Sequence, residues 1–197
     1  MLQLPPIPSW DALHPLIIHF PIALLLIAPI FIIVGAVLQP AKGRAYLIGA
    51  MVLLLGGTAA IYVAIETGEA AGKLAERVPG VERVIETHES LAERTRTVFT
   101  VLSVIFAALL VAPRLLKKND TRLTTTILPL AFLVLYGGGA LLLVNTAHNG
   151  GRLVHEFGVR AIVASSSPAN ANTTAPFNAE QENDCRPKGE PEQASSV

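Results

Sequence analysis

Packing alone does not readily explain the five histidines of this chain. His14 and His19 stand in the segment HPLIIHFP, at the start of the first long apolar run, and His88, His148 and His155 follow later. Ionisable side chains within or beside an apolar membrane segment are costly and usually mark a functional site. Neutral imidazole is a common ligand of haem iron, copper and zinc. The histidines therefore indicate a bound redox group or metal.

Other kinds of chemistry find no support in the sequence. It contains no Ser–His–Asp grouping, no phosphate-binding loop, no H-E-x-x-H zinc motif and none of the Glu-x-x-His pairs typical of di-iron bundles. Cys185 is the only cysteine, so it cannot form an internal disulfide, and it lacks the C-x-x-C-H context of covalent haem c. The formal net charge is zero, which gives no indication of nucleic acid binding.

Four apolar blocks must position these histidines. Apolar residues make up 51% of the chain and charged residues only 15%, and the apolar residues gather in blocks 16–38, 45–65, 98–112 and 127–144. A helix needs about 20 residues to cross the hydrocarbon of a bilayer. The first two blocks meet this length directly, and the other two require flanking residues. The sequence therefore predicts an all-α, polytopic membrane four-helix bundle.

The predicted domain covers residues 1–163, and residues 164–197 form a tail. The tail is rich in Ser, Asn, Pro, Glu and Ala without periodicity, so we expect it to be disordered. No Lys or Arg precedes the first block, so we expect a retained helix rather than a cleaved signal peptide. The four helices are expected at about residues 14–38, 44–66, 81–116 and 124–148.

The third helix is predicted to extend beyond the outer face of the membrane. Apolar side chains recur with helical spacing from Val81 to Leu102. His88 falls inside this apolar stripe, so it is expected to face the neighbouring helices. Before it, residues 69–78 could form a short surface helix, and Pro79-Gly80 marks a turn.

Loop charge predicts the orientation, because Lys and Arg accumulate on the cytoplasmic side. The two short links carry mainly basic residues, whereas the middle link, 66–96, carries seven acidic and five basic residues. Both termini are therefore expected on the outer, non-cytoplasmic side. This orientation places His14, His19, His88 and His148 in one thin layer near the outer surface. The basic residues of the short links are Lys42 and Arg44, then Arg114, Lys117, Lys118 and Arg122.

Two histidine motifs resemble those of a known family. HPLIIHFPI and AHNGGRLV, together with a lone histidine in the middle link, resemble bacterial membrane proteins of domain of unknown function family 2231, over roughly residues 13–163. The resemblance implies a four-helix domain of the bacterial inner membrane with family histidines at His14, His19, His88 and His148. With the orientation above, both termini are expected to be periplasmic. Family members resemble redox-associated proteins, often joined to haem c or Rieske-type domains. This chain departs from the pattern at His155, where tyrosine is usual, and has no such appended domain.

The favoured interpretation of the histidines is that the protein is a membrane-bound, b-type cytochrome-like electron-transfer subunit rather than a stand-alone enzyme. One or two b haems would be held by His14 or His19 together with His88 or His148. Glycines at 56–57 and 137–139 could line the ring, although close helix packing is the favoured explanation for the glycines taken alone. Haem propionates require basic donors near the outer surface, and the candidates are Arg94, Arg96 and Arg152.

Two further interpretations stay open. One is a small-metal site for copper, zinc or iron, and the other is a cofactor-free structural or accessory subunit of a respiratory membrane complex. The expected partners are membrane lipid and, for an electron-transfer subunit, a periplasmic c-type cytochrome, quinol or a larger respiratory complex. Neither His155 nor Cys185 is assigned a role.

Overall fold

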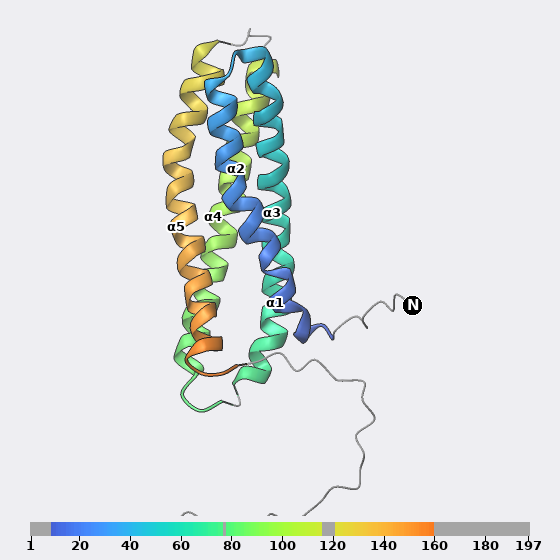
Figure 1. The fold of residues 1–197 in the computed structure, drawn as a ribbon, viewed down its shortest axis with the longest axis vertical. Helices are drawn as coiled ribbons and strands as arrows, with labels where there is room; N and C mark the ends of the chain where they lie inside the picture. Colours follow the sequence, from blue (N-terminus) through green and yellow to red (C-terminus); the bar gives the residue numbers. More distant parts are fainter. Residues whose placement is uncertain (1–8, 77, 116–120, 160–197) are drawn as a thin grey trace, which may run out of the picture. The chain divides into compact units, whose positions relative to one another are not determined.

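The computed structural model describes residues 9–76, 78–115 and 121–159, which form a four-helix bundle without strands (Figure 1). This confirms the predicted fold class. Four helical segments of the described chain are long and apolar enough to cross a membrane. They comprise η1 (Asp11–Leu13), α1 (His14–Ile17) and α2 (His19–Val37), then α3 (Pro40–Ala75), then α4 (Glu82–Leu115), and last the π-helical turn η2 (Leu123–Ile127) with α5 (Leu128–His155).

The second helical segment is much longer than predicted. The short surface helix expected at 69–78 is wrong as a separate element, because α3 continues unbroken to Ala75. Alanines favour this continuation, and Thr67 and Ala75 are buried against the bundle. With 36 and 34 residues, α3 and α4 are each about 50 Å long, which exceeds the roughly 30 Å of hydrocarbon. The predicted tail, 164–197, lies outside the described residues.

The bundle exposes apolar side chains and buries hydroxyl groups, as expected of helices surrounded by lipid. Val37, Val134 and Leu141 are 76%, 78% and 74% exposed. In the interior, Thr58 of α3 hydrogen-bonds Ser103 of α4 over 2.9 Å, so these hydroxyls satisfy one another between helices. Lipid is as apolar as the helix surfaces, so the hydrophobic effect does not drive membrane helices together. Interhelical hydrogen bonds and close packing hold them together instead.

A proline inside α2 leaves a backbone carbonyl that another helix satisfies. Pro29 has no N–H, so it cannot donate to the carbonyl of Leu25 four residues earlier. The hydroxyl of Tyr136 in α5 donates to that carbonyl over 2.6 Å. Tyr136 also makes an edge-to-face contact with Phe99 of α4, with ring centroids 5.6 Å apart. This tyrosine therefore connects three helices at the centre of the core.

Two of the glycines considered for a haem slot, Gly57 and Gly139, serve helix packing. A Cβ atom on Gly57 would lie 2.6 Å from Cγ of Leu25, and one on Gly139 would lie 2.9 Å from Cδ1 of Leu102. Neighbouring helices fill the space beside these two glycines. Gly137 and Gly138 are exposed, with no atom within 4 Å of the added carbon. The packing explanation therefore holds for Gly57 and Gly139 but not for Gly137 and Gly138.

We expect Gly57→Ala to lower the free energy of unfolding by about 1–3 kcal/mol, because overpacking a tight core displaces its neighbours. Gly138→Ala is the matched control, since its added methyl group enters open space and the variant should be neutral or slightly more stable. Denaturant titration in detergent micelles, followed by circular dichroism, measures both values. Equal stability of the two variants would contradict the packing role of Gly57.

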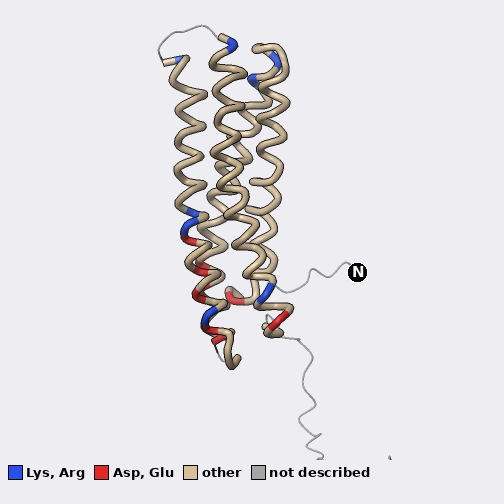
Figure 2. Tube along the Cα trace, turned by 90° about the vertical axis from the view of Figure 1, so that its left-hand side faces the viewer, with Lys and Arg blue, Asp and Glu red and all other residues tan. Residues whose placement is uncertain are grey.

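Charge divides the bundle along its length (Figure 2). The end where α2 joins α3 carries basic residues, including Lys42 and Arg44. The described acidic residues all lie toward the opposite end, where α3 ends and α4 begins. Pro79 and Gly80 make the turn there, as predicted, and Gly80 adopts a positive φ of 79° that suits glycine.

Candidate histidine site

All five histidines belong to the end of the bundle where α1 and α4 begin and α5 ends (Figure 1). His14 and His88 are half-buried, whereas His19, His148 and His155 are exposed. The predicted four-histidine layer is thus divided into an inner pair and two residues on the surface.

His14 is held by a buried threonine of α3. Its Nδ1 lies 3.1 Å from Oγ1 of Thr67, a residue with no exposed surface. The Thr67 hydroxyl has one hydrogen, which it donates to the carbonyls of Val63 at 3.1 Å and Ala64 at 3.0 Å within its own helix. With its hydrogen used in this way, the Thr67 oxygen accepts from His14, which corresponds to the tautomer with the proton on Nδ1 and a lone pair on Nε2.

His88 is held in the corresponding manner by α5. Its Nδ1 lies 3.0 Å from the backbone carbonyl oxygen of Thr146, which can only accept, so Nδ1 is again the donor. The Thr146 hydroxyl hydrogen-bonds Thr95 of α4 over 2.8 Å, which fixes the carbonyl that receives His88. The Nε2 atom of a neutral His88 therefore also carries a lone pair.

Each imidazole lies against a glycine of the helix that holds it. A Cβ atom on Gly68 would lie 3.0 Å from Cε1 of His14, and one on Gly150 would lie 2.9 Å from Cε1 of His88. Both distances are too short for an ordinary contact, so the two glycines provide the space that the rings occupy. The same arrangement, a histidine on a threonine and beside a glycine, occurs in both halves of the bundle.

The two half-buried rings belong to different helix pairs at the same end of the bundle. His14 packs on α3, and His88 packs on α5. The structure thus provides two nitrogen donors at this end, one from each half of the chain.

The other predicted histidines do not join this pair. His19 follows His14 by five residues, which is about 140° around a helix, and it is exposed together with Phe20. His148 is exposed on α5, two residues after Thr146. Across the described parts of the chain, no group of three or more His, Cys, Asp or Glu side chains could hold a metal ion.

The three arginines proposed for propionates have different surroundings. Arg94 is exposed beside a shallow hollow on α4. Arg96 stacks over Tyr62 with its guanidinium carbon 5.6 Å from the ring centre. Arg152 forms an ion pair with Glu156 at 2.9 Å, and this hydrogen bond holds the pKa of the exposed Glu156 carboxyl below its usual value. Only Arg94 is thus without a partner among these observed contacts, and the structure does not gather the three into one group.

Sequence reasoning missed Thr67, Gly68 and Gly150 as members of the site. A signal was available for Gly150, which lies inside the AHNGG motif, and Thr67-Gly68 forms a small-residue step near the end of α3. Their role depends on which helix faces each histidine, so the tertiary structure was needed to recognise it.

A membrane-spanning four-helix bundle with two half-buried histidines at one end is the class of protein that this fold defines. The chain belongs to the family of predicted membrane proteins DUF2231, whose family model matches residues 10–162. The match covers all four helices and both histidines of the pair, and it confirms the resemblance seen in the sequence. No curated protein and no solved structure matches the chain significantly.

Proposed function

We propose that this protein is an electron-transfer subunit of the bacterial inner membrane that binds one haem b through His14 and His88. The observation that supports the proposal is the pair of half-buried imidazoles, each with Nδ1 engaged as a donor and Nε2 carrying a lone pair. Haem b is a one-electron carrier when bound between two such nitrogen atoms.

The number of donors favours haem over a small metal ion. Zinc sites take at least three protein ligands, whereas a porphyrin supplies four nitrogen atoms and needs only two axial ligands from the protein. The described residues offer two half-buried histidines at one end of the bundle and no group of three metal-binding side chains. The donor set therefore fits haem iron, although neighbouring helices fill the space beside Gly57 and Gly139, two of the glycines expected to line a haem slot.

The residues around the pair would orient the ligands. Histidines that bind metals almost always donate their second N–H to a carbonyl or another acceptor, which fixes the ring and makes the binding nitrogen more basic. Thr67 provides such an acceptor for His14, and the Thr146 carbonyl provides one for His88. Gly68 and Gly150 leave room for the rings.

Charge distribution supports a periplasmic location for the site. The histidine pair lies at the end opposite to Lys42 and Arg44 (Figure 2), and basic loops favour the cytoplasm. Both ends of the described chain are at the histidine end. Electrons would then be exchanged with a periplasmic c-type cytochrome, with quinol or within a larger respiratory complex.

A cofactor-free accessory subunit is the second candidate function. Each ring already has a hydrogen bond and a close glycine neighbour, which is sufficient to place a structural histidine. Haem binding by the protein therefore has to be measured directly.

Absorption spectroscopy of the purified full chain tests the proposal. We expect a reduced-minus-oxidised α-band typical of haem b, with about one haem per chain in the pyridine haemochrome assay. Protein produced with ample haem supply, and then incubated with haemin, gives the upper limit of binding. A helical protein that stays colourless under both conditions would contradict haem binding and leave the accessory subunit.

A further inference from the structure

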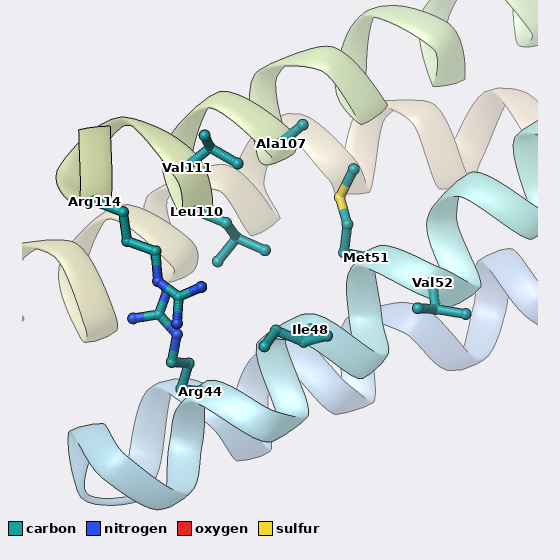
Figure 3. A pocket seen from close by; sticks show the side chains of 8 residues that line it. All are labelled: Arg44, Ile48, Met51, Val52, Ala107, Leu110, Val111 and Arg114. Atoms are coloured by element: carbon teal, nitrogen blue, oxygen red, sulfur yellow. The ribbon is translucent and has the colours of Figure 1, made fainter.

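An apolar groove between α3 and α4 lies at the end of the bundle opposite to the histidine pair (Figure 3). It has a volume of about 220 Å³. Arg44, near the start of α3, and Arg114, in the last turn of α4, reach toward one another at one end of this groove. Its remaining lining is apolar and consists of Ile48, Met51, Val52, Ala107, Leu110 and Val111.

Both guanidinium groups lie at the same end of the groove. None of the described residues that line the groove is acidic. Guanidinium groups bind phosphate through paired, charge-assisted hydrogen bonds, so one phosphate group at this end can contact both arginines.

The apolar walls identify the source of that phosphate. Val52, Ile48 and Val111 are 64%, 47% and 48% exposed, so the groove is open to the surroundings of the bundle, which are lipid for a membrane-spanning helix. A free phosphate ion would gain nothing from these side chains, whereas an acyl chain would pack against them. Basic pockets between membrane helices at the cytoplasmic level bind anionic lipid head groups.

We propose that the groove between α3 and α4 binds an anionic phospholipid, with its phosphate between Arg44 and Arg114 and an acyl chain along the apolar wall. This site is separate from the histidine pair and does not depend on haem binding. Lys42 lies in the same basic region but does not line the groove, and it is exposed, so it provides a matched charge control.

Native mass spectrometry of the delipidated full chain in non-ionic detergent tests the proposal. We expect phosphatidylglycerol to bind as a single adduct and more tightly than phosphatidylcholine with the same acyl chains. Each arginine should contribute about fivefold to the affinity, so Arg44→Gln/Arg114→Gln should weaken binding about 25-fold. Lys42→Gln should bind as the unmodified chain does.

A second variant keeps both charges and obstructs the groove. Ala107→Leu should weaken phosphatidylglycerol binding while circular dichroism shows unchanged helix content, which separates acyl packing from folding defects. Unchanged affinity in both Arg44→Gln/Arg114→Gln and Ala107→Leu would overturn the proposal. So would equal affinity for phosphatidylcholine, or displacement of the lipid by equimolar inorganic phosphate, since the latter result would identify a site for free anions.

Discussion

His14→Ala and His88→Ala are each expected to reduce the haem b content of the purified protein at least about tenfold. Loss of a partner behind a metal ligand already weakens binding by about 10–100-fold, so removal of an axial ligand should have an effect at least as large. The structure holds both rings by Nδ1 and leaves a lone pair on each Nε2. The pyridine haemochrome assay measures the haem content of each variant.

Two exposed histidines of the same helical segments provide the controls. His19 is close in sequence to His14, and His148 is on α5, two residues after Thr146, whose carbonyl holds His88. The control variants are His19→Ala and His148→Ala. Both variants should retain the α-band. Addition of imidazole to His88→Gly should restore part of the spectrum if the ring acts as a ligand. Loss of the band in His19→Ala and His148→Ala, with retention in His14→Ala and His88→Ala, would contradict this assignment.

Tyr136→Phe is expected to lower the free energy of unfolding by about 1–3 kcal/mol, the cost of leaving a buried polar group without a partner. The hydroxyl of Tyr136 donates to the carbonyl of Leu25, and both residues are almost completely buried. That carbonyl lacks its usual helical donor because residue 29 is proline. The expected loss therefore arises at one carbonyl oxygen, since phenylalanine preserves the aromatic packing.

The double variant Pro29→Ala/Tyr136→Phe isolates this effect. Alanine at position 29 restores an N–H that can donate to Leu25, so Tyr136→Phe should cost at least about 1 kcal/mol less in this background than in the original chain. Denaturant unfolding in micelles of the four proteins of the cycle provides the coupling energy. An equal cost of Tyr136→Phe in both backgrounds would show that the tyrosine does not compensate for the proline.

The helices were predictable because lipid imposes a simple rule on the backbone. Every N–H and C=O group within hydrocarbon must be satisfied inside the protein, so apolar blocks of spanning length become helices. The four predicted segments correspond to the four observed ones. The extension of α3 through 69–75 was missed because a charged segment outside the membrane gives no hydropathy signal, although its alanines favour helix.

The membership of the histidine site was only partly predictable. Loop charge predicted the side of the membrane on which each histidine lies, and counting residues predicted its depth. Together they placed His14, His19, His88 and His148 at one end of the bundle. The direction of each side chain depends on the rotation of its helix against the neighbours. His14 meets Thr67 and Gly68 of α3, whereas a rotation of about 140° leaves His19 exposed.

By itself, the sequence determined that this chain forms four membrane helices and that its histidines occupy one end. Hydrophobicity and charge are properties of each residue, so these conclusions require no knowledge of helix contacts. Only the tertiary structure decided that His14 packs on α3 and His88 on α5, that Tyr136 compensates for Pro29, and that Arg44 and Arg114 share a groove. These features join residues far apart in the chain, and their distances are set by how the helices rotate and pack.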